Sequence, residues 1–166
     1  SPQPTVAPSP TPTQTPAQQQ DLQQVYGSCG LLAWPSVLYS IYLQDDANPW
    51  TEEALAQTRQ NLAVAVDWIT QQAQTYSAQP KIYYDTGENN LSTFAAYKAG
   101  LTEDTTTGTT FYDDVETLTA QVDVEFIQQQ YGTASIGYLI FLPVEGASYS
   151  ILHYLEDGGN YLNEFS

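Results

Sequence analysis

The residues with catalytic potential in this sequence are few, beginning with one histidine and one cysteine. His153 is the only histidine and stands three residues before Glu156, and Cys29 is the only cysteine. On a helix, a His-x-x-Glu pair shares one face and could bind a metal ion. A hydrolytic zinc site takes three protein ligands, however, and a cysteine nucleophile needs a base beside it. Because the residues around His153 alternate with a period of two, we interpret it as a strand histidine and predict no catalytic or metal-binding residue in this chain.

Acidic side chains form the second group that could carry out chemistry. Asp45, Asp46, Asp85 and Glu88 all fall at the ends of predicted strands, where α/β proteins commonly place their sites. Two carboxyl groups that converge in one cleft could act as the acid and the base of a hydrolase. Loops and helix starts also attract such residues for solvation alone, so a carboxylate-based hydrolase stays a third hypothesis. A serine triad is not indicated, because the sequence contains no G-x-S-x-G.

The charge of the chain excludes several classes of partner. It contains 19 Asp and Glu residues but only three basic ones, Arg59, Lys81 and Lys98, which gives a formal net charge of −16. Such a surface repels phosphate backbones, so we predict no nucleic-acid binding. Anionic membrane surfaces are disfavoured for the same reason. No apolar run approaches the roughly 20 residues that span a bilayer, so we also predict no membrane insertion.

The chain divides into a tether and one domain. Residues 1–24 are rich in Pro, Thr, Ser and Gln, and the first twenty residues hold six of the ten prolines. Proline fixes φ and removes hydrogen-bond donors, so this segment is expected to be extended. Tethers of this composition commonly hold an exported domain away from a surface, which favours a secreted or cell-surface tethered protein. Residues 25–166 are predicted to form a single α/β domain that is incomplete at its carboxyl end.

A strand, a long helix and a second strand come first in this domain. Residues 36–44 are mostly apolar, with β-branched and aromatic side chains, and are predicted to be a buried strand, and residues 80–87 are predicted to be the second strand. Between them, Thr51 is the expected N-cap of a helix that ends near Tyr76. This order predicts a βαβ unit with parallel strands and a right-handed crossover. The apolar stripe expected to face the sheet consists of Leu55, Leu62, Val66 and Ile69.

The second half of the domain adds helices and a hairpin. We expect a short helix within 92–100, a longer helix over about 113–131, and a central strand over 135–144. Residues 148–155 alternate as a strand, and DGGN predicts a hairpin to a return strand from residue 161. The sum is an α/β (α+β) fold: a mixed, mostly parallel twisted sheet of about four to five strands, a C-terminal antiparallel hairpin and two main helices.

Three stretches resemble the amino-terminal part of exported bacterial metallopeptidases of the zincin (metzincin-like) type. They are VLYSIYLQDDANPWTEEALAQTRQNLAVAVDWITQQAQTYS, GYLIFLPV and SYSILHYLEDGGNYLNEF. The helix start WTEEA, which is similar to the W-T-x-E-E start of that family, and the stretch AVAVDWI carry much of the likeness, which covers residues 36–166 apart from most of the 86–110 loop. The resemblance implies a zincin-like N-terminal subdomain followed, after the hairpin, by a helix bearing H-E-x-x-H. That motif supplies two zinc ligands and a general base.

H-E-x-x-H is not present in this sequence. The resemblance therefore implies a scaffold that is inactive alone and binds no cofactor, with zinc expected only if such a helix exists downstream. It also implies that an antiparallel edge strand pairs with an extended peptide or protein substrate by strand addition. The residues suggested for this role are Ser148, Tyr149, Ser150 and Ile151. The alternative for these four residues is an ordinary sheet edge.

Two functions from different classes follow. The first is the N-terminal scaffold of a secreted or surface-tethered zinc-dependent metallopeptidase. The second is a non-enzymatic, surface-tethered module that binds a peptide, a glycan or another cell-surface protein, or assembles with itself. An exposed aromatic patch, or an edge strand pairing with a neighbouring copy, would favour the second.

Overall fold

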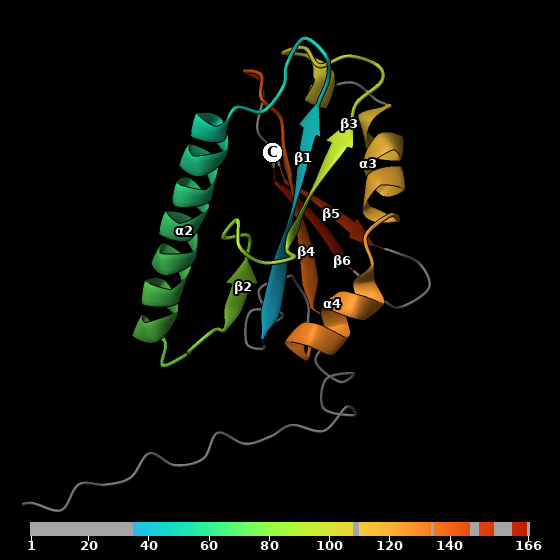
Figure 1. Ribbon diagram of the computed structural model, residues 1–166. Helices are drawn as coiled ribbons and strands as arrows, with labels where there is room; N and C mark the ends of the chain where they lie inside the picture. The colour runs from blue at the N-terminus through green and yellow to red at the C-terminus, as the bar shows by residue number, and fades with distance from the viewer. Residues whose placement is uncertain (1–34, 108–109, 134, 147–149, 155–160, 166) are drawn as a thin grey trace, which may run out of the picture.

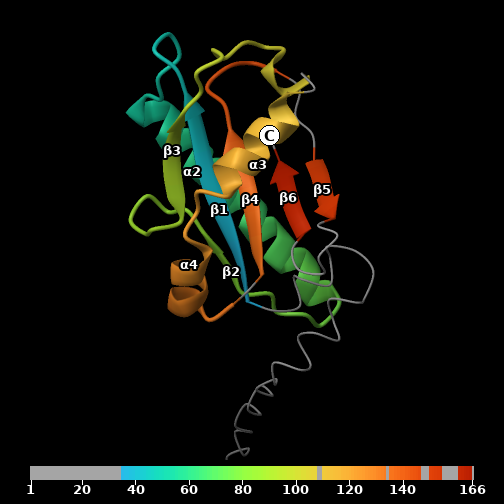
Figure 2. The same ribbon diagram turned by 90° about the vertical axis from the view of Figure 1, so that its right-hand side faces the viewer.

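The fold has three layers, with one sheet between two layers of helices. The computed structural model describes residues 35–107, 110–133, 135–146, 150–154 and 161–165. Helix α2 (Glu52–Thr75) covers one face of the sheet, and α3 (Phe111–Thr119) and α4 (Val124–Tyr131) cover the other (Figures 1 and 2). A short 3-10 turn, η2 (Thr105–Thr107), precedes α3. The predicted α/β class is therefore correct.

The sheet has six strands in the described part of the chain. They are β1 (Ser36–Gln44), β2 (Ile82–Tyr84), β3 (Ser92–Ala96), β4 (Ile136–Phe141), β5 (Ser150–Tyr154) and β6 (Tyr161–Phe165). The strand order is β2-β1-β4-β6-β5, and β3 also pairs with β1. All pairs are parallel except β5 with β6. The mostly parallel sheet, the central position of β4 and the antiparallel hairpin agree with the prediction.

One edge of β1 is shared by two short strands. β2 pairs with the first part of β1, and β3 continues along the same edge from Ser40 onward. The loop 85–91 interrupts what would otherwise be one strand, which is why the sheet has six strands rather than four to five. The short helix expected within 92–100 is wrong, because that segment forms β3. Pairing with β1 and full burial of Leu91 outweigh the helix propensity of its alanines.

Helix α2 begins and ends close to the expected residues. The Oγ1 of Thr51 accepts a hydrogen bond from the Ala54 N–H at 3.1 Å, which caps the first turn. Leu62 and Val66 are buried against Leu139 of β4. This contact confirms that the apolar stripe faces the sheet.

The opposite face of the sheet holds the larger core. Alternate residues of β1 from Val37 to Leu43 pack against Phe111 and Val115 of α3 and Ile127 of α4. The single helix predicted over 113–131 is two helices, because the chain turns over residues 120–123. The Asp123 carboxylate caps α4 by accepting from the Phe126 N–H at 2.9 Å. A side chain that caps a new helix favours a break over continuation.

No helix within the described ranges combines the length and the apolar character needed to cross a membrane.

Candidate functional site

The candidate substrate strand, β5, lies at one lateral edge of the sheet. β5 is the last strand of the path, and within the described residues it pairs only with β6. Ser150 and Ile151 are its first two residues, opposite Phe165 and Glu164. Ser148 and Tyr149 lie outside the described residues. An edge strand of this kind has one row of backbone N–H and C=O groups directed away from the sheet, so it can accept a further strand.

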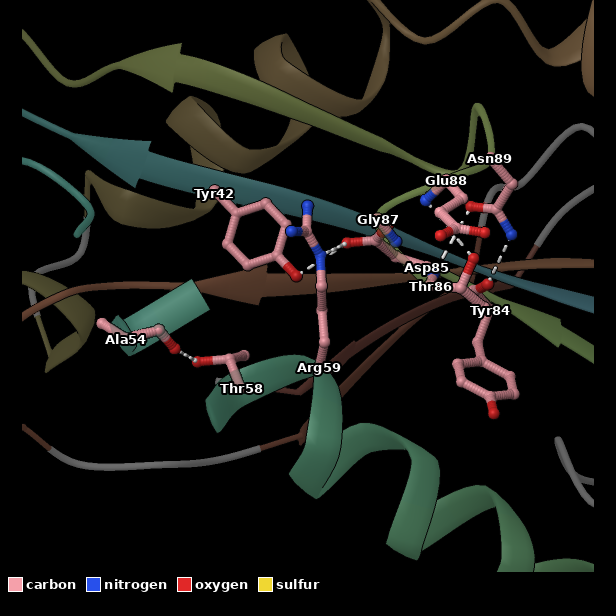
Figure 3. Close-up of polar contacts among 10 residues, drawn as sticks. All are labelled: Tyr42, Ala54, Thr58, Arg59, Tyr84, Asp85, Thr86, Gly87, Glu88 and Asn89. Carbon is pink, nitrogen blue, oxygen red and sulfur yellow. Dashed lines mark hydrogen bonds and ion pairs between the residues drawn. The ribbon is translucent and has the colours of Figure 1, made fainter. Parts of the chain in front are cut away.

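Asp85 is a carboxylate that the sequence placed at a strand end, and the structure surrounds it with donors (Figure 3). It directly follows β2 and is fully buried. Its Oδ2 accepts from the Tyr42 hydroxyl at 2.8 Å and from Arg59 Nε at 2.9 Å. Its Oδ1 accepts from the Gly87 N–H at 2.8 Å. All these donors come from the protein itself, so Asp85 ties β1, α2 and the 85–91 loop together.

These contacts fix the charge of Asp85. Burial alone would raise the pKa of its carboxyl group, but the hydrogen bonds from Arg59, Gly87 and Tyr42 outweigh burial, and the pKa lies below its ordinary value. Burial, followed by the hydrogen bond to Asp85, raises the pKa of the Tyr42 hydroxyl far above the usual range. At neutral pH the group is therefore a carboxylate paired with a guanidinium and a neutral phenol. An ionised acid held by three donors is a poor proton donor.

Asp45 organises a different loop. It directly follows β1 and accepts from the backbone N–H groups of Leu101 at 2.6 Å, Asn48 at 2.6 Å and Ala47 at 2.9 Å. The Leu101 bond is the main cause that holds the pKa of Asp45 below its ordinary value. Asp46 is exposed beside it. Asp45 thus joins the end of β1 to the segment that follows β3.

The predicted carboxylates do not converge on one cleft. The strand register pairs Leu38 with Tyr84, so Asp85 is level with Tyr39, six positions before Asp45 (45 − 39). At about 3.3 Å per residue, the backbone positions of the two residues are separated by roughly 20 Å along the direction of β1. Glu88 is exposed in the loop after β2. This arrangement gives no acid and base pair for a hydrolase.

The described residues offer no set of metal ligands. No three His, Cys, Asp or Glu side chains among them lie together so as to hold a metal ion. His153 belongs to β5, as its period-two surroundings predict, and pairs with Leu162. Cys29 and Glu156 lie outside the described residues. This donor set does not fit a zinc ion, so a zinc-dependent activity would need ligands from other residues.

Arg59 is the residue of this region that sequence reasoning missed. It follows Leu55 by four residues and precedes Leu62 by three, so it lies on the apolar stripe of α2. An arginine on a buried stripe, in a chain with three basic residues, indicates a buried acidic partner. That signal was available, although the sequence could not identify Asp85 as the partner.

No family model, curated protein or solved structure matches this chain.

Proposed function

We propose that this chain is the N-terminal scaffold of a secreted or surface-tethered zinc-dependent metallopeptidase, in which β5 pairs with an extended peptide substrate. The observation that supports the proposal is the position of β5. It is antiparallel to its neighbour in an otherwise parallel sheet and ends the strand order. The resemblance drawn from the sequence implies a substrate strand of this kind, contributed by the same segment.

The residues present determine which part of the proposed activity this chain could contribute. Strand addition requires only backbone groups on a rigid edge, and β4 and β6 hold β5 in the sheet. Zinc, if bound, would polarise the peptide carbonyl and activate a water. Its His-Glu-x-x-His ligands would come from residues outside this sequence. This chain therefore contributes binding and orientation, and alone it should neither bind zinc tightly nor cleave peptides.

The first experiment measures bound zinc and casein or peptide cleavage for this chain and for the product of the complete reading frame. The complete product should bind one zinc ion, cleave the substrate and lose activity with a chelator, whereas this chain should do neither. A reading frame that ends at Ser166, or stoichiometric zinc on this chain, would overturn the proposal.

A second experiment tests β5 itself in the complete product. Backbone N–H groups alternate along a strand, so one of Ser150 and Ile151 directs its N–H outward and the other toward β6. Of Ser150→Pro and Ile151→Pro, one should raise KM about tenfold or more with unchanged thermal stability, and the other should lower stability. Ser150→Ala and Ile151→Val, which keep the N–H, are the matched controls. Unchanged KM in both proline variants would exclude β5 as the substrate strand.

An exposed apolar surface on α2, which includes one aromatic side chain, favours the second candidate, the non-enzymatic binding or self-assembly module. Trp68 is 61% exposed and Val64, one helical turn earlier on α2, is 63% exposed. If they form a docking surface for a second copy, the chain should dimerise at micromolar concentration and Trp68→Gln should abolish the dimer. A monomer at all concentrations by analytical ultracentrifugation would exclude self-assembly through this surface.

A further inference from the structure

β3 has an open backbone edge on the side of the sheet opposite β5. The Ser40 N–H donates to the Leu91 carbonyl at 2.9 Å, so the odd-numbered backbone groups of this segment face β1. Because these groups alternate along a strand, the even-numbered ones face away from the sheet. They belong to Ser92, Phe94 and Ala96. Within the part of the chain that the structure describes, these three outward N–H groups have no backbone acceptor.

The end of the neighbouring β2 edge is covered by a side chain, in contrast to the β3 edge. The Tyr84 carbonyl at the end of β2 accepts from the Asn89 side-chain amide at 2.9 Å (Figure 3). Asp85 and Gly87 hold the 85–91 loop in place for this contact. β3 itself reads STFAA, and so lacks the proline and the charged side chains that commonly block an edge.

An aromatic surface lies beside this edge. Phe94 is 47% exposed, and its ring stacks on Tyr42 at 5.3 Å between centroids. Tyr42 is in turn stacked on Phe141 at 5.4 Å and fixed by its bond to Asp85, so Phe94 rests on a rigid support. A strand added to β3 would direct alternate side chains over this face. One of them would meet Phe94, which favours an apolar side chain at that position.

The charge of the chain decides what the partner is. With a net charge of −16, long-range electrostatic repulsion disfavours a second copy at this edge, whereas a cationic segment is attracted. We propose that β3 binds an extended, cationic segment of another protein by strand addition, with an apolar side chain of that segment against Phe94. This site is at the opposite edge from β5 and does not depend on the peptidase proposal.

The test uses this chain and a fluorescein-labelled peptide that alternates lysine and valine, with a glutamate–valine peptide as the charge control. Fluorescence anisotropy should show binding of the lysine peptide at least about tenfold tighter than of the glutamate peptide. Ala96→Pro removes one outward N–H while keeping the bonds to β1, and should weaken binding about tenfold. Ala96→Ser keeps that N–H and should bind like the wild type. Phe94→Ala should also weaken binding.

Amide hydrogen exchange of the wild-type chain identifies the edge without any variant. The peptide should slow exchange at Ser92, Phe94 and Ala96 specifically. Any one of three results would overturn the proposal. The peptide could slow exchange at Ser150–Tyr154 instead of β3, both peptides could bind with equal affinity, or Ala96→Pro and Ala96→Ser could bind the lysine peptide equally. A dimer of this chain that pairs through β3 would also overturn it, because the edge would then serve self-assembly.

Discussion

Replacing Asp85 with asparagine should destabilise the fold, although the two side chains have nearly the same size. Asp85 accepts at both oxygens: Oδ2 binds the Tyr42 hydroxyl and Arg59 Nε, and Oδ1 binds the Gly87 N–H. Asparagine has one oxygen and one amino group. If the amide oxygen faces Tyr42 and Arg59, the amide NH2 group faces the Gly87 N–H. In the other orientation, the amide NH2 group faces Arg59. Either orientation therefore places two donors against each other.

The size of the effect follows from the burial of each donor. A buried donor left without an acceptor costs about 1–3 kcal/mol, and removal of one partner of a buried ion pair costs about 3–5 kcal/mol. The Arg59 side chain is 26% exposed, so water can hydrate part of its charge, which lowers the second figure. We expect Asp85→Asn to lose about 2–4 kcal/mol of unfolding free energy at neutral pH. The melting temperature should fall by roughly 4–16 °C.

The pH dependence separates this charge effect from a packing defect. Because the folded-state pKa of Asp85 is lowered, its contribution to stability is present above its unfolded value of about 3.9 and is lost as the pH falls through the folded value. The stability gap between wild type and Asp85→Asn should therefore be largest at neutral pH and narrow below about pH 4.

Urea denaturation at several pH values measures this gap. Glu88→Gln is the matched control, because it removes one carboxylate that is exposed, and it should change stability by less than about 0.5 kcal/mol. A gap below about 1 kcal/mol at neutral pH, or a gap that stays constant into acid, would refute the account of Asp85 as a buried charge partner.

Three further perturbations test other parts of the fold. Gly146→Ala should lower the free energy of unfolding, measured by urea denaturation, by about 1–3 kcal/mol, because a Cβ there would lie 2.9 Å from the Glu103 carbonyl oxygen. Gly132→Asn is the control and should leave the free energy of unfolding nearly unchanged, because a Cβ at Gly132 would have no neighbour within 4 Å. Leu62→Ala should lower the free energy of unfolding by about 2–4 kcal/mol, and Val64→Ala, on the outer side of the same helix, by less than about 0.5 kcal/mol. Equal losses would contradict the assignment of Leu62 to the face of α2 that packs on the sheet. Burial and the bond to Asp114 raise the pKa of Tyr97 to about 12, so ultraviolet titration should show late ionisation that Tyr97→Phe removes. The stability that Tyr97 adds should be present below about pH 10 and disappear as the pH rises through its folded value.

The elements with strong local signals could be predicted from the sequence. The helix that starts after Thr51 has a capping residue, acidic residues in its first turn and an apolar stripe, and these agree with its bounds. The parallel pairing of β1 and β2 followed from the length of the connection between them. In both cases the information lies within a few dozen consecutive residues.

Features that depend on distant contacts were not predicted. The segment 92–96 is rich in alanine and serine, yet it is a strand because β1 offers it an unpaired edge. The partners of Asp85 come from three segments, so the sequence indicated a carboxylate at a strand end but not its role. The break after Thr119 depends on the Asp123 cap, and the apolar spacing across it gave no sign of the interruption. Local propensity fails where tertiary pairing or a single side-chain bond decides the outcome.

The two open edges of the sheet should bind their partners independently. β3 lies beside β1, and the path from β1 through β4 and β6 to β5 places four strand spacings between the edges, or about 19 Å. Sites this far apart, with no shared side chain, should have nearly additive effects. If the proposed peptidase activity exists, Ala96→Pro should therefore leave its KM unchanged, and the proline variant of β5 that raises KM should bind the lysine–valine peptide like the wild type. If each variant impaired both activities, the two edges would be coupled, and the sheet could not be acting as a rigid frame between them.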